Sequence, residues 1–407
     1  MFSLALRMYA WISTVESGSD LNSAQNKVLD RNTIRSTYPM YKVFDMEYVN
    51  SIFAGYSEPK MNYSPFTGWR RKPYSNKAVT VESIYGTRLS ENHEVNDSIW
   101  FFGGSTMWGT GVDDANTIPS LYAKKTGATV WNLGESAFNS FQEYVQLSKL
   151  LVNNLKPKLV VFYDGINEAQ YCNTNNKTFP THVRVEKMQE YMKEYDVLKK
   201  RNKELKQHII VLEKQKNNQV NSILGSFKSI YNYMSDPIVR LYKKSSNRSV
   251  LGKGKLREDL KSNIPFSEFK SKGNYKDCDK SLDKVYKAAS TTVKTWLMSY
   301  SLLKAEGIDL KIILQPTASL KPELLQLEYL ANLEKQVIID EKDSYNAMYK
   351  EIRRLWAGKC IKYNACDSLY DISDVFDGLK ENIYIDSMHL SPRGNDIVAE
   401  KMIPLLD

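Results

Sequence analysis

Short apolar runs that alternate with helical stretches constrain the fold of this chain most strongly. The first run, Ile99-Trp100-Phe101-Phe102, is followed at once by two glycines, which is typical of a buried parallel strand that ends in a tight turn. Further strands are expected at 129–132, 159–163, 310–314 and 369–372, and helices at 118–125, 140–155, 288–305, 346–356 and 394–406. This alternation predicts a three-layer α/β/α fold, flavodoxin-like, with a central parallel sheet of about five strands and a long helical insertion.

The 407 residues are enough for one large α/β domain with insertions, or for two domains. We predict that residues 96–175 and 288–407 form the α/β domain. Residues 1–95 contain many prolines and few periodic apolar positions, so we expect an irregular segment that wraps around that domain. Residues 176–287 interrupt the α/β pattern and are predicted to form a basic, mainly helical insertion.

A heptad pattern runs through the first half of the insertion. Apolar residues and one asparagine follow an alternating spacing of three and four: Met188, Tyr191, Tyr195, Leu198, Asn202, Leu205, Ile209 and Leu212. This pattern predicts a continuous helix over 188–212, and a coiled coil through it would make the protein a homo-oligomer. The equal alternative is a single amphipathic helix that packs on its own domain.

Positive charge is concentrated in the same insertion. The chain has a formal net charge of +9, and residues 181–290 contain 25 Lys and Arg against 13 Asp and Glu, so the remainder is slightly acidic. A basic region of this kind is compatible with an anionic membrane surface or an acidic glycan as partner, and equally with a solvated surface. Nucleic acid is not favoured, because no nucleic-acid-binding motif accompanies the charge.

Four cysteines are too few for a disulfide scaffold, and their spacing does not suggest a zinc site. Cys360 and Cys366 are close enough to form a bridge across a short loop, which would matter only in an oxidising compartment, and free thiols are an equal alternative. Residues 1–12 are apolar but too short to span a bilayer. They could be the end of an anchor that begins outside this chain.

Two separated segments carry residues suited to nucleophilic catalysis. Ser105 follows the first strand and its two glycines, at a strand end where open α/β sheets bind ligands. Near the C-terminus, Asp386 precedes His389 by three residues, just before the closing helix. His389 could therefore act as the base for Ser105, with Asp386 orienting its imidazole. Each segment alone is also compatible with an ordinary turn or helix cap.

Two further turns support this interpretation. Gly134 follows the second strand, and Asn167 follows the third. Because the carboxyl ends of parallel strands meet at one edge of a sheet, the serine, the glycine N–H and the asparagine amide are expected to lie together. Acyl transfer needs such an arrangement of a nucleophile with donors for the developing oxyanion.

The order of these blocks resembles the SGNH (GDSL-like) hydrolase superfamily. Gly103-Gly104-Ser105 matches its nucleophile block, Gly134 its glycine block, Gly165-x-Asn167 its asparagine block and Asp386-x-x-His389 its closing block. The resemblance implies Ser105, Asp386 and His389 as catalytic residues. It also implies an oxyanion hole formed by Ser105, Gly134 and Asn167, and no metal or cofactor. It covers about residues 98–170 and 308–405, and leaves the N-terminal segment and the insertion unexplained.

The nucleophile block is Gly-Gly-Ser, where the family usually has Gly-Asp-Ser, and Glu168 stands where Asp is common. These departures, with Gly68-Trp69-Arg70-Arg71-Lys72-Pro73 and Gly86-Thr87-Arg88, are similar to a branch associated with bacterial surface polysaccharides. That resemblance implies a serine esterase or O-acyltransferase that acts on an ester, O-acetyl in the first instance, of a carbohydrate. It favours the cell envelope or periplasm over the cytoplasm. The alternative is a non-catalytic assembly or binding protein of the same shape.

Overall fold

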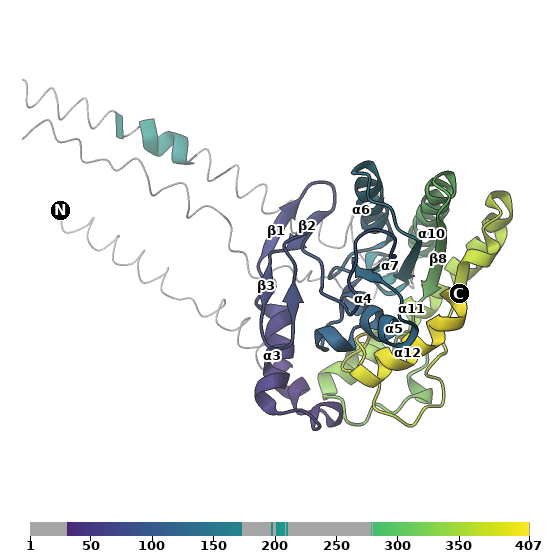
Figure 1. Cartoon of the computed structure of the whole chain (residues 1–407). Helices are drawn as coiled ribbons and strands as arrows, with labels where there is room; N and C mark the ends of the chain where they lie inside the picture. The colour runs from purple at the N-terminus through teal and green to yellow at the C-terminus, as the bar shows by residue number, and fades with distance from the viewer. Residues whose placement is uncertain are drawn as a thin grey trace, which may run out of the picture. The chain divides into compact units, whose positions relative to one another are not determined.

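A computed structural model describes residues 31–172 and 280–406, together with residues 197, 201–207, 209, 210 and 278. Within these residues, a sheet of five parallel strands forms the centre of the fold (Figure 1). Its strands are β5 (Ile99–Gly103), β6 (Val130–Asn132), β7 (Leu159–Asp164), β8 (Asp309–Leu314) and β9 (Leu369–Asp371). The predicted fold class is therefore confirmed, and each of these strands overlaps its predicted range.

The strands lie in the order β6-β5-β7-β8-β9 across the sheet. Counted from β5 along the chain, this is the flavodoxin-like order 2-1-3-4-5. The direction of the connections reverses between β5 and β7, and a crevice forms at such a switch point outside the carboxyl ends of the strands. Ser105 follows β5 and Asn167 follows β7, so both lie at this switch point.

Helices cover both faces of the sheet and bury its side chains in two clusters. Helices α6, α7, α10 and α11 pack on the face that includes Trp100, Phe102 and Phe162. Helices α5 and α12, with part of the N-terminal segment, cover the face that includes Phe101 and Val161. The bounds of these helices are α5 (Ile118–Thr126), α6 (Ser140–Val152), α7 (Ile166–Cys172), α10 (Leu282–Ala305), α11 (Asn332–Tyr363) and α12 (Pro392–Leu406). Successive residues of a strand point to opposite faces of the sheet, so the same strands contribute side chains to both clusters.

Local sequence signals explain where the helices near the Ser105 edge of the sheet begin and end. Helix α5 begins after Thr117, whose side chain accepts a hydrogen bond from the Ser120 N–H, and it ends at Gly127 in a left-handed conformation. Helix α6 begins with a capping box between Asn139 and Gln142. Short 3₁₀ turns connect other elements: η1 (Pro39–Tyr41), η2 (Asp114–Asn116), η5 (Pro322–Leu324) and η6 (Cys366–Ser368).

The N-terminal segment is more regular than we expected. It contains helix α3 (Met46–Ser57), the hairpin of β1 (Met61–Ser64) and β2 (Gly68–Arg71), and the short pair β3 (Tyr74–Ser75) and β4 (Thr80–Val81). The strands were not predicted because, at two to four residues, they are too short to show apolar periodicity, and helix α3 was not predicted either. Trp69 and Tyr41 are buried, and the segment belongs to the same compact unit as the sheet, residues 1–185 and 264–407.

Residues 186–263 form a second compact unit. The predicted insertion, 176–287, reaches further on both sides. Helix α10 begins at Leu282 and not at residue 288, because Ser281 caps it. Within the predicted helix over 188–212, residues 197, 201–207, 209 and 210 are helical. The remainder of the heptad pattern lies outside the described residues, so its continuity, the coiled coil and the homo-oligomer stay predictions.

All four cysteines are paired. Cys172, at the end of α7, is bonded to Cys278, and Cys360 is bonded to Cys366 across the end of α11. From the sequence, Cys360 and Cys366 could equally form a bridge or stay free thiols, and the bridge between Cys172 and Cys278 was not predicted. Cys172 and Cys278 are 106 residues apart, and no sequence pattern links them. Their bridge depends on α7 packing against the start of α10.

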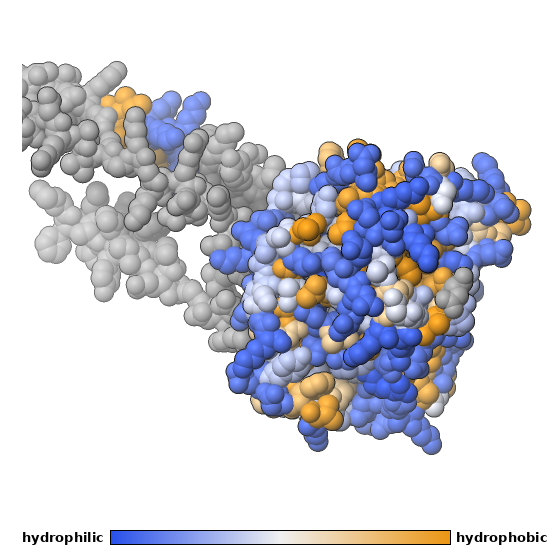
Figure 2. All heavy atoms as spheres, viewed as in Figure 1, coloured by the Kyte–Doolittle hydropathy of each residue, from blue (hydrophilic) through white to orange (hydrophobic). Residues whose placement is uncertain are grey.

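Hydrophilic residues cover most of the visible face of the described body, and hydrophobic residues lie between them in small groups (Figure 2). Among the described residues, no helix combines the length and hydropathy that a membrane span requires.

Candidate active site

Ser105 is the first residue of α4 (Ser105–Trp108), a short helix that starts directly after β5 and the turn at Gly104. Gly104 is required at this position because a Cβ there would lie 2.0 Å from Asn167 Nδ2. Gly104 has no side chain that could cap the helix, so it leaves the N–H groups of the first turn of α4 uncapped. The nucleophile turn and the Asn167 amide therefore pack directly against each other.

The structure brings Ser105, His389 and Asp386 into one chain of hydrogen bonds. His389 Nε2 lies 2.7 Å from Ser105 Oγ, and His389 Nδ1 lies 2.7 Å from Asp386 Oδ2. Ser105 and His389 are largely buried, with 8% of their surface exposed, and Asp386 is deeper, with 4%. In this geometry Asp386 holds the imidazole so that Nε2 faces the serine hydroxyl, as nucleophilic catalysis requires.

A tight loop before α12 presents His389. Asp386 Oδ1 accepts hydrogen bonds from the backbone N–H groups of Met388 and His389, at 2.9 and 2.8 Å, which turns the chain so that the ring meets Asp386 Oδ2. The Ser387 carbonyl accepts from Thr317 Oγ1 and the Ala318 N–H, just beyond β8. The spacing Asp-x-x-His thus places both side chains on one loop that is fixed to the sheet edge.

Asp386 is ionised in this site. Burial alone would raise its pKa, but the charges of His389 and Arg35 outweigh burial and hold the pKa well below its ordinary value. An ionised carboxylate at this position is able to stabilise a positive charge on the His389 imidazole.

Two of the three predicted oxyanion donors already donate within the protein. Asn167 Nδ2 donates to the Phe138 carbonyl at 2.5 Å, and a side-chain amide has a second N–H beyond that bond. The Gly134 N–H donates to Asn132 Oδ1 at 3.1 Å, so it can bind an oxyanion only by sharing or exchanging this bond. Gly134 also packs on α4, since a Cβ there would lie 2.5 Å from the Trp108 nitrogen.

Glu168, where Asp is common in the resembling family, supports the asparagine turn. Its carboxylate accepts hydrogen bonds from the Gly165 N–H at 2.7 Å and the Ser140 N–H at 2.6 Å. It therefore ties the turn that carries Asn167 to the start of α6. Burial raises the pKa of Glu168 and, with neighbouring carboxylates, also the pKa values of Asp164 and Glu143.

Arginines of the N-terminal segment hold the loops of this site. The guanidinium groups of Arg71 and Arg88 lie 3.8 and 4.5 Å from the centre of the Trp108 ring. Arg88 also pairs with Asp114 at 2.5 Å, and Arg70 donates to the carbonyls of Leu133 and Gly134. The resemblance connected these arginines to a family branch without giving them a role. In the structure Arg70 binds the backbone at Gly134, Arg88 binds the carbonyls of Trp108, Gly109 and Val112, and Arg71 binds the side chains of Glu135 and Ser136.

Arg35 was missed by the sequence analysis altogether. It lies in a helical turn over residues 31–36, and its Nη2 is 2.5 Å from Asp386 Oδ2, the oxygen that also meets His389. The same nitrogen is 3.1 Å from Glu334, which in turn pairs with Arg31. An isolated arginine 351 positions before its partner gives no pattern that a single sequence reveals.

Replacement of Arg35 by methionine is expected to lower kcat for a small ester about tenfold, equivalent to about 1.4 kcal/mol, with KM unchanged. The acid limb of the kcat/KM profile should also move to higher pH, because a cation that opposes protonation of the Asp386–His389 pair is lost. Steady-state kinetics between pH 5 and about 9 measure both effects. Arg31→Met is the control, since Arg31 pairs with Glu334 and not with Asp386. Equal losses in both variants would contradict a specific role for Arg35.

Glu341, on α11, is expected to make stability depend on pH. Burial raises its pKa from 4.5 to about 7. Because the folded-state value is the higher one, its contribution to stability is fully present below about pH 4.5 and is lost as pH rises through about 7. Glu341→Gln should therefore gain roughly 1–3 kcal/mol in unfolding free energy relative to the parent between pH 5 and about 8. Urea unfolding at both pH values measures this, and parallel pH dependences would refute it.

Among the residues that the structure describes, no group of three or more His, Cys, Asp or Glu side chains is arranged to hold a metal ion. His93, the other described histidine, lies 3.4 Å from Glu82 and does not join the Ser105 site. His182 and His208 lie outside the described residues.

Comparisons with known proteins add little to this geometry. No protein-family model matches the chain, and no curated protein matches it. Among solved structures, it is similar to LAE5, described as an alpha/beta hydrolase enzyme from the metagenome of Lake Arreo, Spain, over 77% of this chain and 96% of that one. The sequence identity is 12% and the TM-score 0.31, which is too low to support a functional argument.

Proposed function

We propose that this protein is an SGNH-type serine esterase or O-acyltransferase whose nucleophile is Ser105. The observation that carries the proposal is the continuous set of hydrogen bonds from Ser105 Oγ through His389 to Asp386, both at 2.7 Å. A serine hydroxyl is a weak nucleophile unless a base takes its proton. His389 is placed to do so, and Asp386 is ionised to stabilise the resulting imidazolium.

In the proposed mechanism, Ser105 Oγ attacks the acyl carbon while His389 Nε2 takes its proton. The negative charge that develops on the carbonyl oxygen is stabilised by the Ser105 N–H and the second N–H of Asn167, with the Gly134 N–H as third donor. His389 then returns the proton to the departing alcohol, which leaves an acyl group on Ser105. Water or a sugar hydroxyl, deprotonated by His389, releases this group to complete hydrolysis or transfer.

An ester of a carbohydrate, O-acetyl in the first instance, is the proposed substrate class. The resemblance of the N-terminal arginine blocks to the surface-polysaccharide branch supports this choice. The two disulfides support an oxidising compartment, such as the cell envelope, because disulfides persist outside the reducing cytosol.

The direct test of the proposal is turnover of a generic acetyl ester by the full chain, measured with and without an added saccharide acceptor. Release of acetate alone would indicate an esterase, and appearance of an acetylated saccharide would indicate a transferase. A folded protein that releases no acetate and acetylates no saccharide would refute the proposal.

A further inference from the structure

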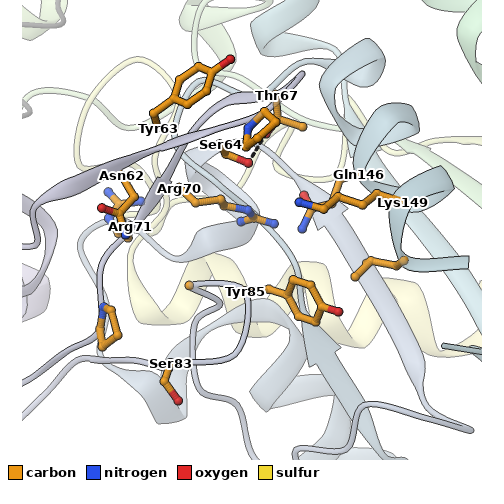
Figure 3. A pocket seen from close by; sticks show the side chains of 14 residues that line it. Asn62, Tyr63, Ser64, Thr67, Arg70, Arg71, Ser83, Tyr85, Gln146 and Lys149 are labelled. Atoms are coloured by element: carbon orange, nitrogen blue, oxygen red, sulfur yellow. Dashed lines mark hydrogen bonds between the residues drawn. The ribbon is translucent and has the colours of Figure 1, made fainter. Parts of the chain in front are cut away.

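A second feature, a cavity with a volume of about 260 Å³, lies between the β1–β2 hairpin, residues 83–86 and helix α6. It is slightly smaller than the ~300–1,000 Å³ typical of small-molecule sites, so it has room for one sugar ring, and the second ring of a disaccharide would lie outside it. Figure 3 shows the Arg70 guanidinium and the Gln146 amide pointing toward each other across it, with the Tyr85 ring beside them.

Gln146 provides a hydrogen-bond acceptor that the described protein does not satisfy. The residue is only 5% exposed, and its Oε1 has no hydrogen-bond partner among the described residues. A buried acceptor without a donor is unfavourable, and most such groups in native structures have a partner. The oxygen is itself buried, so a ligand hydroxyl would supply the missing donor once the Gln146 amide turns this oxygen into the cavity.

The lining also carries positive charge. Arg70, Arg71 and Lys149 line the cavity, and no Asp or Glu is among its described lining residues. Glu135, behind the lining, pairs with Arg71 and lies 3.8 Å from Arg70, whereas Lys149 is an exposed ammonium at the cavity. Cations of this kind suit a ligand that carries a carboxylate.

Two tyrosine rings also line the cavity. Tyr85 lines the cavity with 36% of its surface exposed, and Tyr63, on β1, is 74% exposed at its edge. Tyrosine offers a rigid apolar face with a polar tip, which matches the apolar face of a sugar ring with its hydroxyl rim. The Tyr85 ring makes an edge contact with Trp131, 5.8 Å between ring centres, and still keeps part of its surface open to the cavity.

We propose that this cavity binds an acidic saccharide, a sugar with a carboxylate. A ring hydroxyl donates to Gln146 Oε1, the carboxylate faces Lys149 and Arg70, and the ring packs on Tyr85. Arg70 connects the cavity to the active site, because its guanidinium also donates to the carbonyls of Leu133 and Gly134. That this saccharide is the substrate or acceptor of Ser105 rests on the proposed function, whereas the binding itself does not.

The experiment is calorimetric titration of digalacturonic acid into the full chain carrying Ser105→Ala, so that no turnover interferes. Cellobiose serves as the neutral counterpart, and inorganic phosphate as the plain anion. We expect digalacturonic acid to bind more tightly than either. Gln146→Leu should weaken that binding about fivefold or more, since it removes the acceptor at nearly constant volume. Lys149→Gln should weaken it about threefold, and the exposed control Lys401→Gln should not change it.

Three results would overturn the proposal. Equal binding of cellobiose that is insensitive to Lys149→Gln would rule out recognition of the carboxylate. Phosphate binding as tight as that of digalacturonic acid, with no effect of Gln146→Leu, would leave a simple anion site. Absence of saccharide binding by the Ser105→Ala protein, when the parent chain hydrolyses acetyl esters, would exclude the subsite and leave the proposed function standing. Saccharide binding by the Ser105→Ala protein, when the parent chain has no esterase activity, would support the subsite and refute the proposed function.

Discussion

Replacement of Ser105 by alanine is expected to reduce turnover of a small acetyl ester by about 10³-fold or more, because removal of the nucleophile of such a triad leaves only the contribution of binding and oxyanion stabilisation. The fold should persist. Ser105 contributes one side-chain hydrogen bond, to His389, and loss of such a bond changes stability by only about 1 kcal/mol. Initial rates of acetate release, with thermal unfolding of the same sample, measure both quantities.

Thr106→Val is the matched control for this change. Thr106 is the next residue of α4, and its hydroxyl donates to Gln315 and not to His389. It should alter turnover far less than Ser105→Ala. If the folded Ser105→Ala protein retains the parent's turnover, Ser105 is not the nucleophile, whatever the effect of Thr106→Val.

The second large effect is expected for Asn167→Ala. Loss of one oxyanion donor lowers kcat by about 10²–10³-fold, while the nucleophile and its base remain in place. Ser105 should therefore still react, slowly, with a serine-directed reagent. The physical reason is that Asn167 Nδ2 lies against Gly104, at the start of the nucleophile turn, and has a second N–H beyond its bond to Phe138.

Asn395→Ala separates this catalytic loss from a loss of stability. Asn395 is also buried, and its Nδ2 donates to a backbone carbonyl, that of Asn116, at 2.9 Å. Both variants therefore lose a comparable structural hydrogen bond. A fall of less than about threefold for Asn167→Ala, or an equal fall in both variants, would place Asn167 outside the oxyanion hole.

The strand positions and the meeting of Ser105, Asn167 and His389 could be predicted because they depend largely on local signals. Each strand is a short apolar run with a turn directly after it, and parallel strands bring those turns to one edge. The Asp-x-x-His spacing is equally local, since the backbone of its own loop orients Asp386. Such features need no knowledge of contacts between distant segments, except for the assumption of a parallel sheet.

Two features that the sequence did not reveal depend on contacts between distant segments. Arg35 reaches Asp386 across 351 positions, and Cys172 meets Cys278 across 106. The hairpins of the N-terminal segment were missed for a different reason, since their strands are too short for periodicity. The arginines of β2 illustrate both limits, because Arg71 is visible in the sequence, whereas its place against the Trp108 ring is not.

The most direct measurement of the central claim is the site of covalent labelling by a serine-reactive phosphonate. We expect a single modification on the peptide that contains Ser105, formed by the folded protein and lost on unfolding. His389→Ala should slow this labelling by about 10³-fold or more, because the serine then has no base. Ester hydrolysis should disappear in step with labelling. Labelling of another residue, or full ester turnover by a protein whose Ser105 remains unlabelled, would contradict the account.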